Sequence, residues 1–277
     1  MSHKDKGGDV MVDIKLMQGD CLEKMKDIPD GSVDLTVTSP PYDNLRTYNG
    51  NNALWGEHVW KAAIKDLYRV TKDGGVVVWV VGDATVKGSE TGTSFRQALF
   101  FKEIGFNLHD TMIYIKNQLA FPDSTRYYNA FEYMFIFTKG NIKTFNPIKD
   151  RKNVSVGRVV HGNERTKEGK LREKRSCAGN IVKEYGTRWN YWLMYNQKRG
   201  EETKHPAIFP EQLANDHIIS WSNEGDLVYD PFMGSGTTAK MAILNNRNWI
   251  GSEISEEYCK IIERRITTAS TLLKQVK

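Results

Sequence analysis

Short apolar runs that alternate with amphipathic segments constrain the fold of this chain more than any other feature. Five runs have the length and character of strands: residues 14–20, 33–39, 75–83, 226–232 and 248–254. Four segments carry apolar residues at helical spacing: residues 58–72, 94–105, 237–246 and 255–270. Continuous apolar strands suit a parallel sheet that helices cover on both faces. We therefore predict an α/β fold with a doubly wound, mostly parallel sheet.

Two further strands and a basic segment interrupt this alternation. Residues 110–117 and 131–140 follow each other without a long helix between them, which predicts an antiparallel pair at a sheet edge. Residues 139–204 then hold 17 Lys and Arg against 7 Asp and Glu, a net charge of +10 in a chain whose total is +5. This segment has no clear period. We interpret it as an inserted region that contacts a polyanion, with a solvated loop region as the alternative.

The composition indicates a soluble cytoplasmic protein. The 277 residues are 39% hydrophobic and 26% charged, which is ordinary for a globular chain. No apolar stretch approaches the roughly 18 residues that span a bilayer, and the polar N-terminus lacks the apolar core of a signal peptide. Cys21, Cys177 and Cys259 are widely spaced, which favours inert thiols in a reducing cytoplasm. The sequence offers no convincing cluster of metal ligands.

A glycine-rich turn between a predicted strand and a predicted helix indicates a cofactor site. Gly234, Gly236 and Ala239 match the G-x-G-x-x-G/A pattern. In this pattern the backbone approaches a ligand closely and the helix start offers free N–H groups. Glu253 lies 19 residues after Gly234, at the end of the next strand, where an acid can accept the hydroxyls of a ribose. A tight turn with a surface glutamate is the alternative interpretation.

The residues before the glycines favour S-adenosylmethionine over a dinucleotide. Asp230-Pro231-Phe232 places a carboxylate and an aromatic ring directly before the turn. The carboxylate can bind a cationic amino group, and the ring can pack on the ligand. A pyrophosphate would gain nothing from the negative charge.

A second motif ends the strand at residues 33–39. In TVTSPPY, residues 36–42, neither proline has an N–H to give to a sheet ladder. Ser39-Pro40-Pro41-Tyr42, taken with DPFMGSGTT at residues 230–238, resembles the amino-methyltransferase family of DNA modification enzymes. In that family [S/D/N]-P-P-[Y/F] is the catalytic motif and D-P-F-x-G-S-G-T-T is the cofactor motif. The order of catalytic motif, basic segment and cofactor motif is similar to the β class, and the resemblance extends from about Ile14 to Ile266.

The resemblance implies an S-adenosylmethionine-dependent enzyme that acts on double-stranded DNA. It implies a methyltransferase domain made of a catalytic part, residues 1–138, and a cofactor-binding part, residues 205–277. Residues 139–204 would be the target-recognition region. It also implies a spatial order in which the strand at 226–231 starts the sheet and the strands at 248–254, 14–19 and 33–39 follow.

The resemblance further implies which residues hold the cofactor. Asp20 matches the acidic residue that meets the adenine, with a strand-end turn residue as the alternative. His205-Pro206 matches the motif that helps to hold the methionine part, with an exposed helix start as the alternative. The full set is Asp20, His205, Pro206, Asp230, Pro231, Phe232, Gly234, Ser235, Gly236, Thr237, Thr238 and Glu253.

The catalytic motif suits the activation of an exocyclic amine. The lone pair of such an amine is delocalised into the ring, so two acceptors aimed at its hydrogens would make it more nucleophilic. The Pro40 carbonyl and the Ser39 oxygen can be these acceptors, Pro41 keeps the turn free of donors, and positioning supplies much of the rate. A base in a duplex must be flipped out to reach them, and Tyr42 can stack on it. None of the three cysteines follows a proline, so attack on a ring carbon is disfavoured.

Several features stay open at this level. SPPY is more common with cytosine N4 in the family, so we favour cytosine N4 over adenine N6. A DNA-binding protein with an inactive methyltransferase core is an alternative of another class. A homodimer and a cognate restriction endonuclease are candidate partners that the sequence does not decide. The residues predicted to contact DNA are Asn44, Arg46, Arg126, Arg151, Lys152, Arg158, Arg165 and Arg188.

Overall fold

The computed structural model describes residues 15–41, 55–116, 124–160, 162–173, 179–194 and 210–276. The chain divides into two compact units. Unit 1 comprises residues 1–146 and 190–277, and unit 2 comprises residues 147–189. Unit 2 is shorter than the predicted target-recognition region, because residues on both sides of it belong to unit 1.

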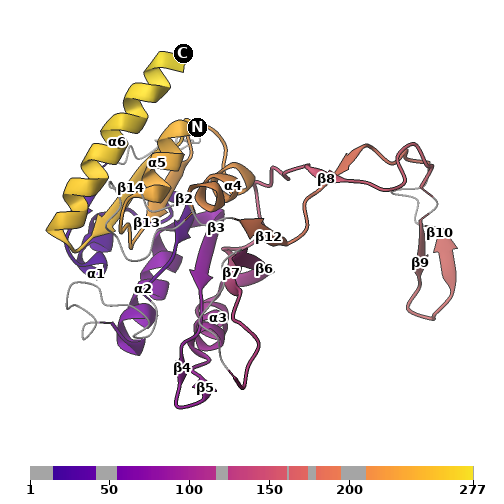
Figure 1. The fold of residues 1–277 in the computed structure, drawn as a ribbon, viewed down its shortest axis with the longest axis horizontal. Helices are drawn as coiled ribbons and strands as arrows, with labels where there is room; N and C mark the ends of the chain where they lie inside the picture. The colour runs from indigo at the N-terminus through magenta and orange to yellow at the C-terminus, as the bar shows by residue number, and fades with distance from the viewer. Residues whose placement is uncertain are drawn as a thin grey trace, which may run out of the picture. The chain divides into compact units, whose positions relative to one another are not determined.

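Unit 1 is built on an eight-stranded sheet with the order β1-β14-β13-β2-β3-β7-β6-β12 (Figure 1). The strands in chain order are β1 (Lys15–Gln18), β2 (Val33–Thr38), β3 (Thr71–Val81), β6 (Asn107–Lys116), β7 (Phe131–Thr138), β12 (Tyr191–Met194), β13 (Leu227–Asp230) and β14 (Asn248–Glu253). Strand β7 runs antiparallel to β3 and β6, and the other pairs are parallel. The predicted mostly parallel sheet is therefore confirmed.

Helices cover both faces of this sheet. They are α1 (Cys21–Lys24), the 3-10 helix η1 (Met25–Asp27), α2 (Glu57–Val70), α3 (Thr93–Ile104), α4 (Glu211–Trp221), α5 (Thr237–Leu244) and α6 (Glu256–Val276). Along β3, Val76, Val78 and Val80 join the core cluster that contains residues of α4, α5 and α6. Val77 and Trp79 join the cluster that contains residues of α2 and α3. Since alternate residues face opposite sides of a strand, both faces of β3 are apolar from Val76 to Val81.

The observed strand order corrects one expectation. Strands β13, β14 and β1 are neighbours in the predicted order, but the strand at 33–39 does not follow β1. Instead β2 pairs with β13 on the side away from β14, with Val228 opposite Leu35. The helix after β13 packs on one face and the helix after β2 on the other. The two halves of the sheet therefore extend in opposite directions from the β13–β2 pair.

The antiparallel pair predicted near the sheet edge is present, but it is not the edge itself. Strands β6 and β7 pair with Met112 opposite Met134. Strand β12 adds outside β6 and buries Trp192 and Met194 in the core. All four residues of β12 are apolar, so no alternation reveals it. Helix α4 is also absent from the predicted elements, because its buried face carries the polar residue His217.

Shorter elements complete the chain. Strands β4 (Thr85–Val86) and β5 (Ser89–Glu90) form a small hairpin before α3. Unit 2 contains two further antiparallel pairs, β8 (Arg151–Lys152) with β11 (Tyr185–Gly186) and β9 (Asn163–Arg165) with β10 (Leu171–Glu173). Within the described ranges, no helix has the length and apolar character that crossing a membrane requires.

Candidate functional site

The two sequence motifs lie at the carboxyl ends of neighbouring parallel strands. Strand β2 ends at Thr38, directly before Ser39, and strand β13 ends at Asp230. These two strands pair at the point where the sheet changes direction. Ligands of open α/β sheets bind outside the carboxyl ends of the strands at such a switch point. The fold therefore brings the predicted catalytic and cofactor motifs to one place.

A buried hydrogen bond fastens the two motifs together. The Thr38 hydroxyl donates to Asp230 Oδ1 over 2.7 Å, and the Phe232 backbone N–H donates to the same oxygen over 3.0 Å. Burial raises the pKa of Asp230 to about 6, although Thr38, Thr238 and the Phe232 amide act in the opposite direction. Thr238 adds a second link, because its hydroxyl donates to the Val37 carbonyl over 3.2 Å. The end of β2 and the turn after β13, called the cofactor turn below after its predicted role, are thus joined by direct hydrogen bonds.

The glycines of the cofactor motif are required by the backbone. Gly234 and Gly236 have φ angles of +52° and +77°, in the left-handed region that other residues rarely adopt. A Cβ atom on Gly236 would also lie 3.0 Å from Ile262 of α6. Helix α5 begins directly afterwards at Thr237. The turn therefore leaves β13 sharply and points the start of α5 at the carboxyl edge of the sheet.

Glu253, at the end of β14, contacts the glycine turn from the neighbouring strand. Its carboxylate accepts the Gly234 N–H and the Ser255 N–H, each over 2.8 Å. The side chain is buried, and burial raises its pKa to about 7, with the charge of Asp230 acting in the same direction. Gly251 earlier in β14 permits this close packing, because a Cβ there would lie 2.1 Å from the Met233 sulfur.

Asp20 lies at the same sheet edge. Strand β1 pairs with β14 so that Gln18 is opposite Glu253, and the Gly19 N–H donates to the Glu253 carbonyl over 2.9 Å. Asp20 follows and is exposed, and its Oδ1 accepts the Leu22 N–H over 2.8 Å at the start of α1. This N-cap is the structural alternative considered for Asp20. The carboxylate keeps a second oxygen, so a role toward the cofactor stays a prediction.

Aromatic side chains that the sequence motifs do not include surround Phe232. The Trp55 and Trp79 rings meet the Phe232 ring edge to face, with centroids 5.4 and 6.2 Å away. The Trp79 indole N–H is held by Gln97 over 2.9 Å. No local pattern singles out these tryptophans, since Trp79 lies within an ordinary apolar strand and the fold alone brings Trp55 to the cofactor turn.

A half-buried ionic network on α6, α4 and α5 contacts the glycine turn. Arg265 donates to the Ser235 carbonyl over 2.6 Å, to the Ser235 hydroxyl over 2.8 Å and to the Thr237 hydroxyl over 3.2 Å. Its other nitrogen contacts Glu211 over 2.7 Å, and Glu211 also contacts Lys240 over 2.6 Å. In the sequence Arg265 resembles any cation on the solvent face of a long helix. Only the packing of α6 against the turn reveals its contacts.

The remaining described residues of the predicted catalytic and cofactor motifs lie at the ends of β2 and β13. Ser39 is half-buried and Pro40 is buried, directly beyond the last residue of β2. Pro41 is half-buried, and Pro231 is buried beside Asp230. The predicted residues Tyr42, Asn44, Arg46, His205 and Pro206 lie outside the described ranges.

The predicted DNA contacts have different surroundings. Arg126 donates to the Gly88 carbonyl, and Arg188 pairs with Asp150 in unit 2. Arg151 donates to the Thr187 carbonyl over 3.0 Å and lies over the Trp189 ring at 4.3 Å. These three arginines have intramolecular partners. The other predicted contacts in the described ranges are exposed and belong to unit 2: Lys152, Arg158 and Arg165.

The cofactor turn suits a cationic ligand that carries hydroxyl groups. Asp230 and Glu253 are both buried, and neither forms an ion pair with another described residue. A buried carboxylate without a cation nearby is costly, which is why both pKa values are raised. The sulfonium and amino groups of S-adenosylmethionine supply positive charge, and its ribose supplies hydroxyl donors. The residues present therefore fit this cofactor.

The fold is that of class I S-adenosylmethionine methyltransferases. The solved structure of the PvuII DNA methyltransferase, described as cytosine-N4-specific, superposes with a TM-score of 0.66 at 22% identity and covers 93% of this chain and 91% of its own. The complex of M1.HpyAVI with S-adenosylmethionine superposes with a TM-score of 0.62 at 23% identity, over 91% of this chain and 98% of the other.

Sequence similarity defines the family. The family of N6 and N4 DNA methylases matches residues 33–264. The orphan methyltransferase M.BamHII of Bacillus amyloliquefaciens is 57% identical over 260 residues, which are 91% of this chain and 95% of that protein. This chain belongs to the N6/N4 DNA methylase family, and it is a DNA methyltransferase that uses S-adenosylmethionine.

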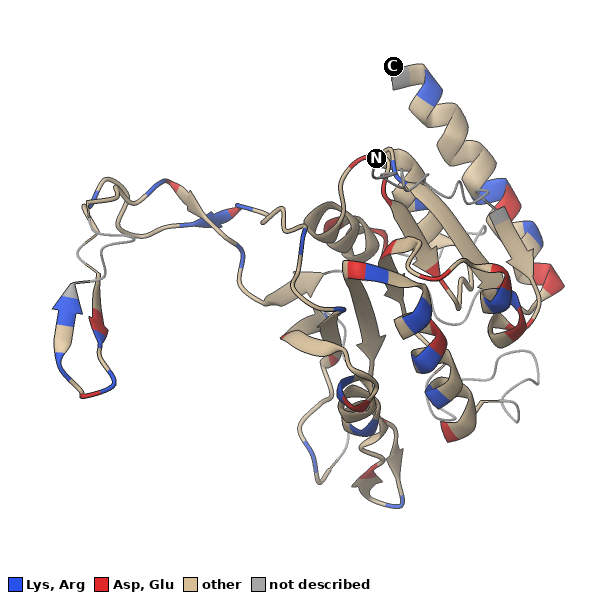
Figure 2. Cartoon of the chain, turned by 180° about the vertical axis from the view of Figure 1, so that it is seen from behind, with Lys and Arg blue, Asp and Glu red and all other residues tan. Residues whose placement is uncertain are grey.

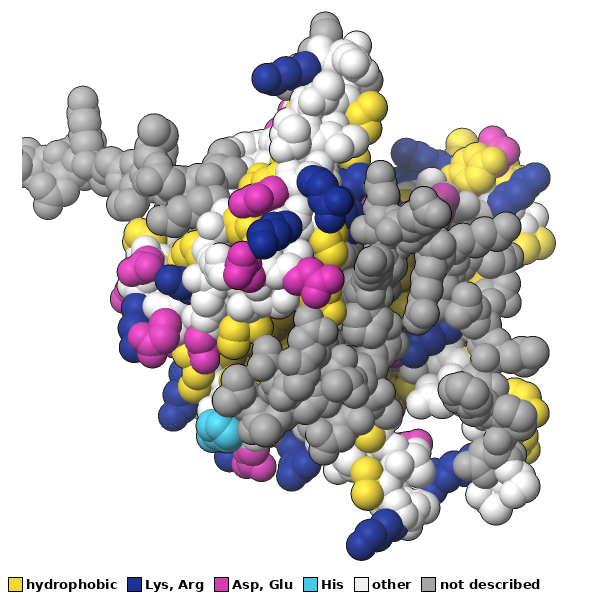
Figure 3. All heavy atoms as spheres, turned by 60° about the vertical axis from the view of Figure 1, so that its left-hand side comes forward, with side chains coloured by type: hydrophobic (Ala, Val, Ile, Leu, Met, Phe, Trp, Pro, Cys, Tyr) yellow, Lys and Arg dark blue, Asp and Glu magenta, His cyan; other side chains and the backbone are white. Residues whose placement is uncertain are grey.

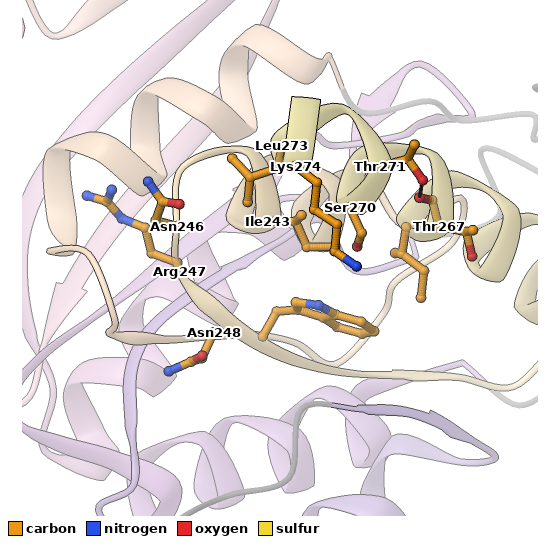
Figure 4. A pocket seen from close by; sticks show the side chains of 11 residues that line it. Ile243, Asn246, Arg247, Asn248, Thr267, Ser270, Thr271, Leu273 and Lys274 are labelled. Carbon is orange, nitrogen blue, oxygen red and sulfur yellow. Dashed lines mark hydrogen bonds between the residues drawn. The ribbon is translucent and has the colours of Figure 1, made fainter. Parts of the chain in front are cut away.

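A separate hollow lies at the opposite edge of the sheet. It has a volume of about 700 Å³ and is lined where α5 ends, β14 begins and the last turns of α6 pass over them, by residues that include Asn246, Trp249, Ile266 and Lys274 (Figure 4). Strand β14 starts at this hollow and ends at Glu253, so the hollow is not part of the cofactor turn. No sequence motif predicts it.

Proposed function

We propose that this DNA methyltransferase transfers a methyl group to the exocyclic amine of a base flipped out of duplex DNA, with cytosine N4 as the favoured target. The observation that carries the proposal is the buried hydrogen bond from Thr38 to Asp230. It ties the residue before Ser39 to the start of the cofactor turn. The amine acceptors and the methyl donor would therefore be held in a fixed relation, which is the main catalytic requirement of a direct transfer.

The proposed roles follow from the chemistry of each group. S-adenosylmethionine supplies a methyl group bound to a positively charged sulfur. The Pro40 carbonyl and the Ser39 oxygen accept the hydrogens of the target amine and orient its lone pair. Neither is a strong base, so they orient the amine rather than deprotonate it. Tyr42 would stack on the flipped base, with about 1–3 kcal/mol gained per stacked ring.

The proposed cofactor contacts centre on the two buried carboxylates. Glu253 would accept hydroxyl groups of the ribose in addition to the two backbone N–H groups that it already accepts. Asp20 would meet the adenine, and Phe232 would pack against the ligand. Asp230 orients the turn through its hydrogen bonds and adds negative charge next to a cationic ligand.

The base specificity and the partners are finer proposals. Ser39 in place of an acidic residue favours cytosine N4, and adenine N6 is the alternative that the family also includes. We propose that residues 139–204 recognise the target sequence in double-stranded DNA. A cytoplasmic location is proposed from the bacterial relative. A homodimer and a cognate restriction endonuclease stay predictions without a supporting contact.

Substitution of the catalytic turn tests the proposal. Ser39→Ala and Pro40→Ala should each lower methyl transfer from labelled S-adenosylmethionine to duplex DNA by roughly 100-fold, because each disturbs an acceptor of the amine. Ser32→Ala, in the same segment but bonded to the Pro29 carbonyl, is the matched control and should retain activity. Mass spectrometry of the product nucleosides distinguishes N4-methylcytosine from N6-methyladenine.

The outcomes separate the competing functions. Unchanged rates in both variants, with normal thermal melting and cofactor affinity, would contradict the catalytic assignment. Binding of DNA by the unaltered protein without any methyl transfer would favour the inactive-core alternative. N6-methyladenine as the sole product would overturn the preference for cytosine.

A further inference from the structure

Unit 2 is a two-stranded ribbon. Its outgoing and returning chains exchange backbone hydrogen bonds along their length, including Asn153 N–H to the Glu184 carbonyl over 2.8 Å and Val160 N–H to the Asn180 carbonyl over 2.8 Å. Its β9–β10 end is closed by the Thr166 N–H, which donates to the Lys170 carbonyl over 2.8 Å. None of the described residues of unit 2 is buried. A two-stranded ribbon without a core is marginally stable alone, so a partner is expected to stabilise it.

The positive charge of unit 2 indicates that its partner is negatively charged. Residues 147–189 hold 12 Lys and Arg against 5 Asp and Glu, a net charge of +7. Figure 2 shows basic residues along both strands of the unit. In contrast, the face of unit 1 over α6 carries acidic and basic side chains side by side (Figure 3). A strongly basic ribbon is suited to a polyanion such as duplex DNA.

The β9–β10 end of the ribbon has two unlike faces. Cross-strand partners share a face, so Glu164 and Arg172 project together and form an ion pair with 2.7 Å between Nε and Oε1. Arg165 projects from the opposite face, where its cross-strand partner is the apolar Leu171. Arg165 is exposed, and the residue directly across from it carries no charge, whereas Arg172 has Glu164 across from it. One face thus carries a cross-strand ion pair, while on the other face the guanidinium of Arg165 lies opposite an apolar side chain.

We infer that the β9–β10 ribbon enters the major groove of the target DNA and that Arg165 reads a guanine there. The inference rests on the proposed role of this region in target recognition. The major groove is about 12 Å wide and admits a two-stranded ribbon, and Arg is the side chain that pairs with both O6 and N7 of guanine. Leu171 beside it offers apolar contact to a neighbouring base edge.

The cations near Arg165 are suited to contact phosphates rather than bases. Lys167 and Lys170 lie within the turn that joins β9 to β10, and both are exposed. Lysines at the end of a ribbon suit the phosphates that line the groove, which position the protein without reading sequence. Arg172 is held by Glu164 on the other face, so it does not take part in base reading.

A binding selection tests this inference independently of catalysis. Duplexes from a randomised pool are selected with the unaltered protein, with Arg165→Ala and with Arg172→Ala, and the bound sequences are compared. Arg165→Ala should lose preference for guanine at one position by roughly 10- to 100-fold. Arg172→Ala, the matched control in the same hairpin, should keep the preference of the unaltered protein. Equal melting temperatures and equal S-adenosylmethionine affinities establish that the variants are folded.

A chemical probe tests the groove itself. Replacing the selected guanine by 7-deazaguanine removes N7 from the major groove while retaining base pairing. It should weaken binding of the unaltered protein and cause no further loss in Arg165→Ala.

The results have distinct meanings. An Arg165→Ala variant that weakens all duplexes alike, or an Arg172→Ala variant that alters the preference equally, would overturn the inference. So would selection of RNA over duplex DNA by the unaltered protein. Methyl transfer to the selected duplex is measured separately: its absence with an intact guanine preference contradicts the proposed catalysis alone. Normal methyl transfer with an unchanged preference in Arg165→Ala contradicts this inference alone.

Discussion

The affinity of the protein for S-adenosylmethionine should depend on pH through Glu253. The carboxylate is buried at the end of β14 and its pKa is raised to about 7, chiefly because burial disfavours its charge. If Glu253 accepts ribose hydroxyls, the cofactor binds the ionised form and must compete with a proton. Binding should therefore release a proton and become tighter as the pH rises through 7.

The size of this effect follows from the pKa. With a pKa of about 7, the ionised fraction falls from about nine-tenths at pH 8 to about one-tenth at pH 6, so affinity should weaken about tenfold. The stability of the ligand-free protein should change with pH in the opposite direction, and decrease as the pH rises. Since the folded pKa lies above the ordinary value of 4.5, the contribution of Glu253 to the free energy of unfolding is largest below about pH 4.5. It falls by about 3 kcal/mol as the pH rises through 7.

Isothermal titration calorimetry across pH 6 to 8 measures the affinity directly. Glu253→Gln keeps the size of the side chain without its ionisation, and this variant retains any pH dependence that comes from the ligand itself. We expect a weaker affinity with a much flatter pH profile. The reasoning is refuted by an unaltered protein whose dissociation constant is constant over this range, or by a variant with the same slope.

Two further substitutions test the support of the cofactor turn. Arg265→Met removes the hydrogen bonds to Ser235 and leaves Glu211 with Lys240 as its remaining cation, so we expect a loss of about 1–3 kcal/mol of stability in denaturant unfolding. An unchanged midpoint would contradict a supporting role for the network. Gly251→Ala would force a Cβ against the Met233 sulfur. It should cost about 1–3 kcal/mol and weaken cofactor affinity, and an unaltered affinity would show that the turn tolerates displacement.

Much of the fold can be predicted from local patterns. The apolar runs predict β2, β3, β13 and β14, because a strand buried on both faces needs apolar residues on both of them. The absence of a long helical pattern between 110–117 and 131–140 predicts the antiparallel β6–β7 pair. Strand β12 was not predicted, because its four apolar residues stand in a basic segment and show no alternation of apolar and polar residues. Trp192 and Met194 are buried only because β12 pairs with the side of β6 that β7 leaves open.

The position of β2 required the tertiary structure for a different reason. An apolar pattern predicts that a segment forms a buried strand, but it does not predict which strand of the sheet pairs with it. The hydrogen bond between Thr38 and Asp230 joins residues 192 positions apart, and it exists only because β2 and β13 are neighbours. The expectation that the strand at 33–39 follows β1 was wrong on this point.

The sequence by itself predicted the chemistry of this protein, because the S-P-P-Y motif, the glycine pattern and the acid at Glu253 are recognisable from their residues and their spacing along the chain. Only the tertiary structure showed which residues from other elements contact these motifs. Arg265 contacts Ser235 from another helix, the Trp55 ring contacts the Phe232 ring, and Arg165 has Leu171 as its cross-strand partner where Arg172 has Glu164. Such contacts depend on which elements pack together, and that choice is made by the burial of the whole core rather than by any single segment.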